Sequence, residues 1–263
     1  MTHLLIFGLG YTAGRIANHL SAQGWTVEAT GSAGTLDFAD RVGVAAAIGR
    51  ASHILSSVPP ADGVDPVLVN HGAALAAAPA QWIGYLSSTG VYGDAGGGWV
   101  DESTPTGAGR RQARTEADAA WQIFSGDVRV FRLPGIYGPG RSALDRVAEG
   151  KARRVDLPEQ VFSRVHVDDI RAGVIASFDG PPGVYNLSDD LPCHQNRVIE
   201  AAADLLGREP PPLQSMEEAQ LSPAARAFYA ENRRVANGRA KRLLGWRPLY
   251  PDYRSGLRAC LAT

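Results

Sequence analysis

The chain has 263 residues, a net charge of −1 and 20% charged residues, so nothing indicates a partner of high charge such as a nucleic acid or an anionic membrane. Hydrophobic residues make up 44% of the sequence, enough for a buried core, and no apolar run is long enough to span a bilayer. The opening residues lack signal-peptide features, and the two cysteines, Cys193 and Cys260, favour a reducing compartment. We therefore expect a cytoplasmic protein, and the spacing of its histidines predicts no metal site.

The first two thirds of the chain alternate short apolar runs with helical patterns. Strands are predicted at 4–7, 26–30, 35–37, 52–58, 82–88, 128–133 and 184–187. Helices are predicted at 11–22, 41–49, 66–78, 110–124, 170–178 and 195–206. This alternation predicts an α/β fold with a doubly wound parallel sheet, a Rossmann fold. We expect the dinucleotide-binding core over 1–187 and a smaller, dependent, α-rich substrate cap over 188–263.

A glycine-rich turn follows the first predicted strand. The sequence GLGYTA fits G-x-G-x-x-A, in which Gly8 permits a tight turn and Gly10 lets a pyrophosphate approach the backbone. Ala13 lets the helix pack close to the strand. Tyr11 and Thr12 are the first two residues of that helix. Free N–H groups and the positive dipole end at this terminus favour an anion. These five residues are predicted to bind the cofactor, NAD or NADP.

The end of the second predicted strand bears on which dinucleotide binds. A carboxylate there would accept hydrogen bonds from the adenosine ribose and repel a 2′-phosphate. Thr30 and Ser32 stand at this end instead, and small hydroxyl side chains accommodate a 2′-phosphate. Glu28 lies within the strand, where it is a ribose ligand or only a partly exposed strand residue. The pattern favours NADP over NAD.

Five later segments resemble those of one protein family. They are YLSSTGVYGD at 85–94, RLPGIYGPG at 132–140, RVHVDD at 164–169, VYNL at 184–187 and LGWRP at 244–248. Together they resemble the extended short-chain dehydrogenases/reductases, the NAD-dependent epimerase/dehydratase family. The Gly-x-Gly-Tyr turn and the sequence SVPP at 57–60 are similar to its atypical, YeeZ-like branch.

The resemblance implies roles for further residues. Those expected at the cofactor are Asp37 near the adenine amino group, Ser56, Ser57 and Val58 beside the groove, Ser87, and Leu133, Pro134 and Ile136 near the nicotinamide amide. The alternative for Asp37 is a loop cap. Ser88 stands where the family places its substrate-binding hydroxyl, and Ser88 or Thr89 would polarise a carbonyl. Apart from the resemblance, Arg141 and Arg164 are candidates to meet an anionic substrate, and surface ion pairs are the equal alternative for both.

The usual proton-transfer pair of the family is missing. In the family, a tyrosine moves the proton and a lysine four residues later lowers its pKa. Ala108 occupies the tyrosine position and Gln112 the lysine position. Arg110, Arg111 and Arg114 supply positive charge nearby, but an arginine stays protonated and is a poor acid or base. A solvated helix face is the simpler interpretation of these three.

Several other polar residues have a structural interpretation. Tyr92 and Tyr137 sit in turns beside glycine, His166 is expected to be a core histidine, and Asp168 and Asp169 are candidate N-caps.

Two functions remain open at this point. One is an atypical oxidoreductase or epimerase-like enzyme that acts on a carbonyl or nucleotide-sugar-like molecule without the Tyr/Lys pair. The other is a non-catalytic NAD(P)-binding sensor or regulator of a small-molecule effector. A homodimer is also compatible with the sequence, because the alanine-rich segment 73–78 permits close helix contact.

Overall fold

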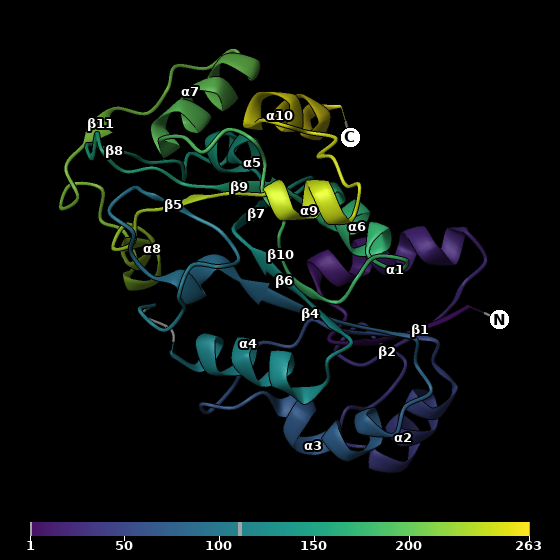
Figure 1. Ribbon diagram of the computed structural model, residues 1–263. Coiled ribbons are helices and arrows are strands. Elements are labelled where there is room, and N and C mark those ends of the chain that lie inside the picture. Colours follow the sequence, from purple (N-terminus) through teal and green to yellow (C-terminus); the bar gives the residue numbers. More distant parts are fainter. Residues whose placement is uncertain (1, 110–111, 263) are drawn as a thin grey trace.

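The computed structural model describes residues 2–109 and 112–262 (Figure 1). Its strands are β1 (His3–Phe7), β2 (Thr26–Ala29), β3 (His53–Ser56), β4 (Trp82–Ser88), β5 (Trp99–Val100), β6 (Val128–Leu133), β7 (Gly135–Tyr137), β8 (Arg154–Val155), β9 (Arg164–His166), β10 (Gly183–Asn186), β11 (Leu213–Gln214) and β12 (Arg234–Val235). Its helices are α1 (Tyr11–Ala22), α2 (Arg41–Arg50), α3 (Pro66–Ala76), the 3₁₀ helix η1 (Thr89–Tyr92), α4 (Gln112–Phe124), α5 (Ala143–Ala148), α6 (Val167–Ala176), α7 (Gln195–Leu205), α8 (Pro223–Phe228), α9 (Gly238–Leu243) and α10 (Tyr253–Leu261).

The centre of the molecule is a parallel sheet with the order β10-β6-β4-β3-β1-β2. Chain connections run outward from β1 in both directions, which confirms the doubly wound Rossmann fold. The predicted bounds of α1, β4 and β6 are confirmed residue for residue. Because all of these strands are parallel, their carboxyl ends meet at one edge, where such sheets bind ligands.

The strand predicted at 35–37 is wrong. Only a single bridge joins Leu36 to Thr30, and the Leu36 N–H donates to the Ala29 carbonyl. Gly31, at φ +111°, turns the chain back beside β2. The Asp37 carboxylate then accepts the Ala39 N–H at 2.9 Å, which turns the chain towards α2 before a ladder can extend.

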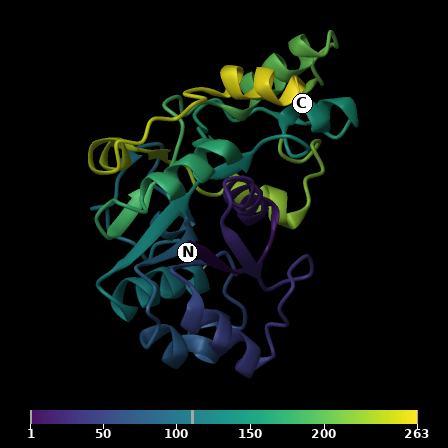
Figure 2. The same ribbon diagram turned by 90° about the vertical axis from the view of Figure 1, so that its right-hand side faces the viewer.

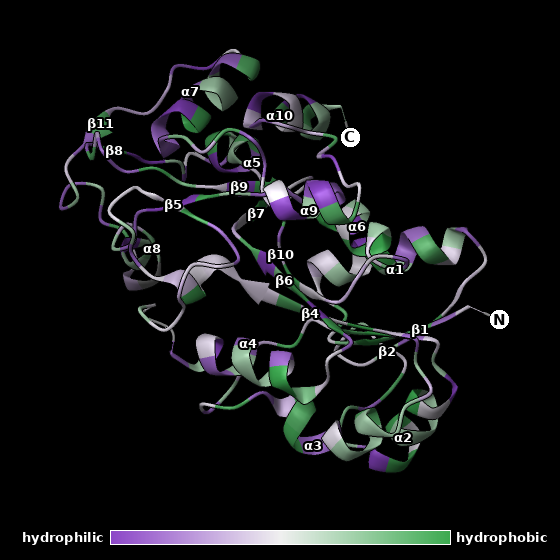
Figure 3. Ribbon diagram, viewed as in Figure 1, coloured by the Kyte–Doolittle hydropathy of each residue, from purple (hydrophilic) through white to green (hydrophobic). Residues whose placement is uncertain are grey.

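Helices cover both faces of the sheet. Leu4 and Ile6 of β1 pack with α1, α6 and α9, whereas Leu5 and Phe7 pack with α2, α3 and α4. This division follows from the alternation of side chains along a strand. Figures 1 and 2 show the two helical layers on opposite sides of the strands. Figure 3 shows hydrophobic residues concentrated along the strands around β1 and β4.

A separate apolar cluster joins α5, α7 and α10 beyond the α6 layer (Figure 1). Leu144 of α5 packs there with Val198 of α7 and Leu257 of α10. One helix of this cluster, α5, precedes residue 187 in the chain, and the other two, α7 and α10, follow it. The division at 187/188 stays a prediction.

The N-terminus of α6 corrects one local prediction. The helix begins at Val167, and its N-cap is His166, whose Nδ1 accepts the Asp168 N–H at 3.2 Å. Neither Asp168 nor Asp169 is the cap, because both already lie within the first turn. The buried Asp169 carboxylate instead accepts the N–H groups of Leu249 and Tyr250, and burial raises the Asp169 pKa to about 6.

Candidate functional site

The glycine turn after β1 has the geometry that a dinucleotide requires. Gly8 has φ +85°, and a Cβ there would lie 3.0 Å from Cγ2 of Val58. The Gly8 N–H donates to the Thr30 hydroxyl at 3.1 Å, which holds the turn against the end of β2. A Cβ on Gly10, by contrast, would meet no atom within 4 Å. Open space therefore lies before α1, and the residues present fit a pyrophosphate at the helix N-terminus.

The adenosine side of the groove contains polar groups that already have partners. Thr30 is buried, and its hydroxyl accepts the Gly8 N–H, whereas Ser32 is exposed. The Asp37 carboxylate caps its own loop, the structural alternative considered for it. Glu28 lies opposite Leu5 in mid-strand and pairs with Arg50 at 2.6 Å and with His3 at 2.7 Å. The hydrogen bond from Arg50 is the main cause that lowers the Glu28 pKa, and these contacts hold its carboxylate within the strand.

The carboxyl end of β3 lies beside the glycine turn. The β3 residue Ser56 pairs in register with Phe7, and the Ser57 N–H donates to the Phe7 carbonyl at 2.8 Å. Val58 follows, in contact with Gly8. Ser56 is fully buried, and its hydroxyl has no hydrogen-bond partner within the described part of the chain. The predicted groove residues are thus brought together with the glycine turn.

Ser88 and Thr89 lie further along the same edge. Ser88 ends β4, and its Oγ accepts the Gly90 N–H at 3.1 Å, which caps η1. This bond uses only a lone pair of the oxygen, so the hydroxyl proton can be donated to a substrate oxygen. Thr89 is buried in η1. Ser88 pairs in register with Leu133, so Pro134, next in the chain, also follows this edge.

Ile136 continues from that edge into β7, which pairs with β9. It is partly buried against the core cluster formed around α1 and α6.

Ser87, predicted at the cofactor, faces an interior network. Its hydroxyl donates to Asp118 at 2.5 Å, and Asp118 forms a buried two-point ion pair with Arg132. Arg132 also donates to the Tyr92 hydroxyl at 3.0 Å, which donates to Asn186 at 2.8 Å. Every member is paired, as buried polar groups require. Burial raises the Tyr92 pKa, so this tyrosine is held as a structural phenol.

The segment that lacks the tyrosine and lysine packs against η1. A Cβ on Gly93 would lie 2.5 Å from the Ala108 carbonyl oxygen, and one on Gly109 would lie 2.1 Å from the Gly90 oxygen. Ala108 therefore sits beside the loop that follows Ser88, with its own side chain exposed. The Gln112 amide donates to Glu116 at 2.9 Å.

Three arginines of that segment were candidate sources of positive charge. Arg110 and Arg111 lie outside the described residues. Arg114 lies near the buried Tyr85. Burial raises the Tyr85 pKa to about 12, and the positive charge of Arg114 opposes that rise.

The structure separates the two arginines predicted for the substrate. Arg141 lies over the ring of Tyr11, with its Cζ 5.6 Å from the ring centroid, beside the glycine turn. Arg164 is buried in β9, where it donates to the Cys193 sulfur at 3.0 Å and lies 5.7 Å from the Tyr253 ring centroid. Each arginine thus belongs to a different part of the molecule.

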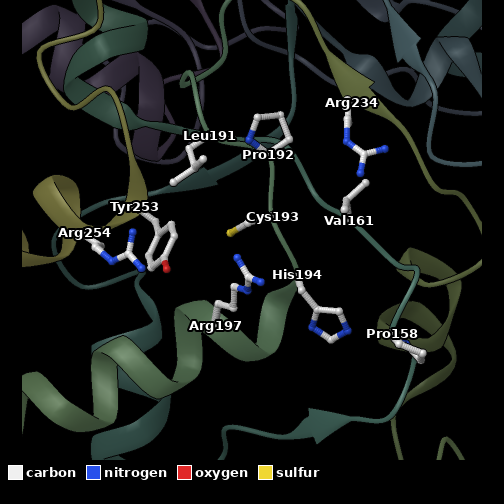
Figure 4. Close-up of a pocket in the computed structure, with 10 residues that line it drawn as sticks. All are labelled: Pro158, Val161, Leu191, Pro192, Cys193, His194, Arg197, Arg234, Tyr253 and Arg254. Carbon is white, nitrogen blue, oxygen red and sulfur yellow. The ribbon is translucent and has the colours of Figure 1, made fainter.

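Beside Cys193 and Tyr253 lies a pocket of about 240 Å³ that the sequence did not reveal (Figure 4). Arg197, Arg234 and Arg254 line it, and Figure 4 shows the Arg197 guanidinium directed towards Cys193. Its lining contains no aspartate or glutamate among the residues that the structure describes. We call this the arginine pocket. Arginines from α7, β12 and α10 meet there, and the only sequence signal was the near absence of lysine from the chain.

A buried carboxyl group lies near the arginine pocket. Asp189 is 2% exposed, and no hydrogen bond of standard geometry reaches either of its oxygens in the described structure. Burial raises its pKa to about 8, against the opposing effect of Arg164. The same burial raises the Cys193 pKa, so this thiol is not activated.

Two features are absent from the residues that the structure describes. No group of three or more histidine, cysteine, aspartate or glutamate side chains is arranged to hold a metal ion. No helix is both long and apolar enough to cross a bilayer within those residues.

Comparison with known proteins identifies relatives over the whole chain, although no family model matches. Protein YeeZ of Escherichia coli K12 is 29% identical, covering 96% of this chain and 97% of that protein. A 3-diazoavenalumate denitrifying reductase of a Streptomyces species is 31% identical, covering 60% of this chain and 55% of the reductase.

Solved structures agree with this grouping. A functionally unknown conserved protein from Silicibacter pomeroyi is 42% identical, with a TM-score of 0.88 and coverage of 100% of this chain and 99% of that one. A putative NAD-dependent epimerase/dehydratase from Methylobacillus flagellatus is 25% identical, with a TM-score of 0.74 and coverage of 99% and 98%. The chain is thus similar in sequence and fold to YeeZ and to a putative NAD-dependent epimerase/dehydratase, which is consistent with an atypical branch of the short-chain dehydrogenases/reductases.

Proposed function

We propose that the chain is an NAD(P)-dependent oxidoreductase of the epimerase/dehydratase type that acts on an anionic carbonyl compound or nucleotide-sugar-like molecule. The observation that carries the proposal is the common sheet edge shared by the glycine turn and Ser88. A dinucleotide laid along that edge would supply hydride chemistry where a hydroxyl can meet a carbonyl oxygen. Similarity to a protein named as a reductase supports an enzyme over a non-catalytic sensor.

NADP is the proposed cofactor form. Glu28, the only acid of β2, is held in mid-strand by Arg50 and His3 and does not reach the end of the strand. Thr30 and Ser32 leave that end without a carboxylate, so no fixed negative charge repels a 2′-phosphate. Binding of NADPH and NADH in one buffer tests this, and tighter binding of NADH would contradict it.

Ser88 is the proposed catalytic hydroxyl, with Thr89 beside it. The Gly90 N–H holds the Ser88 oxygen, which leaves its proton free to stabilise a developing negative charge on a substrate oxygen. No phenol at position 108 and no ammonium at position 112 stands beside it. The proton that completes the reaction would therefore come from water or from the substrate.

The arginine pocket is the proposed anion subsite for the substrate. Three arginines without an acidic partner in the lining attract a phosphate or carboxylate, and the planar guanidinium suits two-point binding. Arg234 also donates to the carbonyl of Gly97, in the loop that follows η1. This bond links the subsite to the segment that carries Ser88.

The experiment is a turnover screen with NADPH and NADH against anionic carbonyl compounds and nucleotide sugars. With any active substrate, Ser88→Ala should lower kcat on the order of 100-fold, the usual effect of removing one oxyanion donor. Its NADPH dissociation constant should not change. Ser21→Ala, on the exposed face of α1, is the control. Tight NADPH binding without turnover of any compound would instead make the chain a binding protein.

The proposed assembly and location follow from surface features. Val69 of α3 and Ile123 of α4 are 66% and 85% exposed, and a homodimer through these helices would cover them. No disulfide joins Cys193 to Cys260 in the described structure, which agrees with the proposed cytoplasmic location. Sedimentation of wild type and Ile123→Glu tests the dimer, and a monomeric wild-type protein would contradict it.

A further inference from the structure

The turn that carries Arg141 is rigid. Residues 138–141 form a tight turn in which the Arg141 N–H donates to the Gly138 carbonyl at 3.0 Å. Pro139 occupies its second position and Gly140, at φ +71°, its third. That order is typical of a type II turn, in which proline and glycine fix both central residues. The backbone of Arg141 is thereby held in one place.

Tyr11 fixes this turn to the glycine turn. Tyr11 is the first residue of α1, directly after Gly10, and its hydroxyl donates to the Pro139 carbonyl at 3.1 Å. A Cβ on Gly138 would lie 2.5 Å from the Tyr11 oxygen, so only glycine permits this contact. The two turns are 128 residues apart in sequence and adjacent in the fold.

The positive charge of Arg141 lies beside the glycine turn and is not neutralised by a neighbouring acid in the described structure. Its guanidinium lies over the Tyr11 ring, and no ion pair engages it within the described structure. Arg15, one helical turn further along α1, likewise has no ion pair there. Burial raises the pKa of the Tyr11 hydroxyl, and the positive charges of Arg15 and Arg141 oppose this rise. Both guanidinium groups therefore act on the Tyr11 hydroxyl.

We propose that Arg141 binds the pyrophosphate of the dinucleotide, and not the substrate as its sequence position implied. The inference rests on the proposed function. A pyrophosphate before α1 carries two negative charges, and the open space at Gly10 lies next to Tyr11. Backbone N–H groups of the helix would bind one side of it, and the Arg141 guanidinium the other.

The test is NADPH binding, followed by nucleotide fluorescence, to wild type, Arg141→Gln, Arg141→Lys and Arg242→Gln. Arg242 is an exposed arginine of α9 and provides the control for charge alone. Loss of one charge-assisted contact should weaken NADPH binding about 10-fold to 100-fold in Arg141→Gln, less in Arg141→Lys and not in Arg242→Gln. The dissociation constant of Arg141→Gln should also depend less on salt, because one screened charge pair is gone.

Each other result is decisive. Equal NADPH affinity in wild type and Arg141→Gln would overturn the inference. Weaker binding with an unchanged salt dependence would also overturn it, because the arginine would then act only through the shape of the turn. A wild-type protein that binds neither NADPH nor NADH would overturn the proposed function itself. Thermal unfolding of the ligand-free variants identifies any loss of fold.

Discussion

Two regions of this protein are suited to bind negative charge, and they are built differently. At the glycine turn, one short segment supplies backbone N–H groups, a helix terminus and open space at Gly10. In the arginine pocket, Arg197, Arg234 and Arg254 come from three elements spread over almost 60 residues. The first region consists mainly of backbone groups, with Arg141 as the one side chain proposed to join them, whereas the second depends entirely on side chains. The comparison teaches that an anion site is visible in sequence only where its groups are consecutive.

The largest expected effect separates cofactor binding from folding at the glycine turn. In Gly10→Val the new side chain meets no protein atom near its Cβ, so the fold should be retained, but it occupies the space of the pyrophosphate. NADPH affinity should fall more than 100-fold, on the order of the loss of several charge-assisted contacts. Calorimetric titration and thermal unfolding measure the two properties separately.

Gly8→Val is the matched variant. It should lose stability as well as binding, because φ is +85° and Val58 is in contact. Unchanged NADPH affinity in Gly10→Val would show that the open space is not the pyrophosphate site.

The next effect concerns the arginine pocket alone. Arg197→Gln with Arg254→Gln should weaken binding of inorganic phosphate about 10-fold to 100-fold, with NADPH affinity unchanged. Competition between phosphate and an active substrate provides the measurement. A parallel loss of NADPH affinity would contradict the separation of the two regions.

The pH dependence of stability should also distinguish the arginine pocket from the glycine turn, because the buried Asp189 lies near the arginine pocket only. Its folded pKa of about 8 exceeds the ordinary value of 3.8, so the folded state retains a proton that the unfolded state releases. The free energy of unfolding should therefore fall as pH rises from about 4 to about 8 through this group.

Asp189→Asn cannot ionise, so its free energy of unfolding should lack the part of the fall that comes from this carboxyl group. Denaturant titration at pH 5 and pH 9 measures the difference, with Asp204→Asn on α7 as the control. Parallel pH profiles of wild type and Asp189→Asn would contradict the assignment. Phosphate binding should weaken above pH 8, because an ionised Asp189 repels an anion in the nearby arginine pocket.

The smallest expected effect is at Tyr92. Tyr92→Phe removes a hydroxyl that bridges Arg132 and Asn186 in the interior, and should cost about 1 kcal/mol of stability or somewhat more. NADPH affinity and most of any turnover should remain, because the hydroxyl is buried away from solvent. Loss of turnover without loss of stability would show that this tyrosine takes part in proton transfer.

Local patterns predicted the core elements well for a physical reason. The apolar runs of β1, β4 and β6 end at glycine, serine or proline, so their bounds follow from burial and from turn chemistry. The failures lie where a distant segment intervenes. Asp169 reads as a helix cap, but the chain near Leu249 takes its carboxylate, and His166 caps the helix instead.

The sequence by itself determined the Rossmann fold, the glycine turn and the absence of a tyrosine–lysine pair, because each depends on neighbouring residues or on their spacing. Only the tertiary structure decided the partners of polar side chains. It placed Arg141 on Tyr11, buried Arg164 beside Cys193 and assembled the arginine pocket. The reason is that arginine side chains are long, and the positions of their guanidinium groups depend on contacts between elements far apart in the chain.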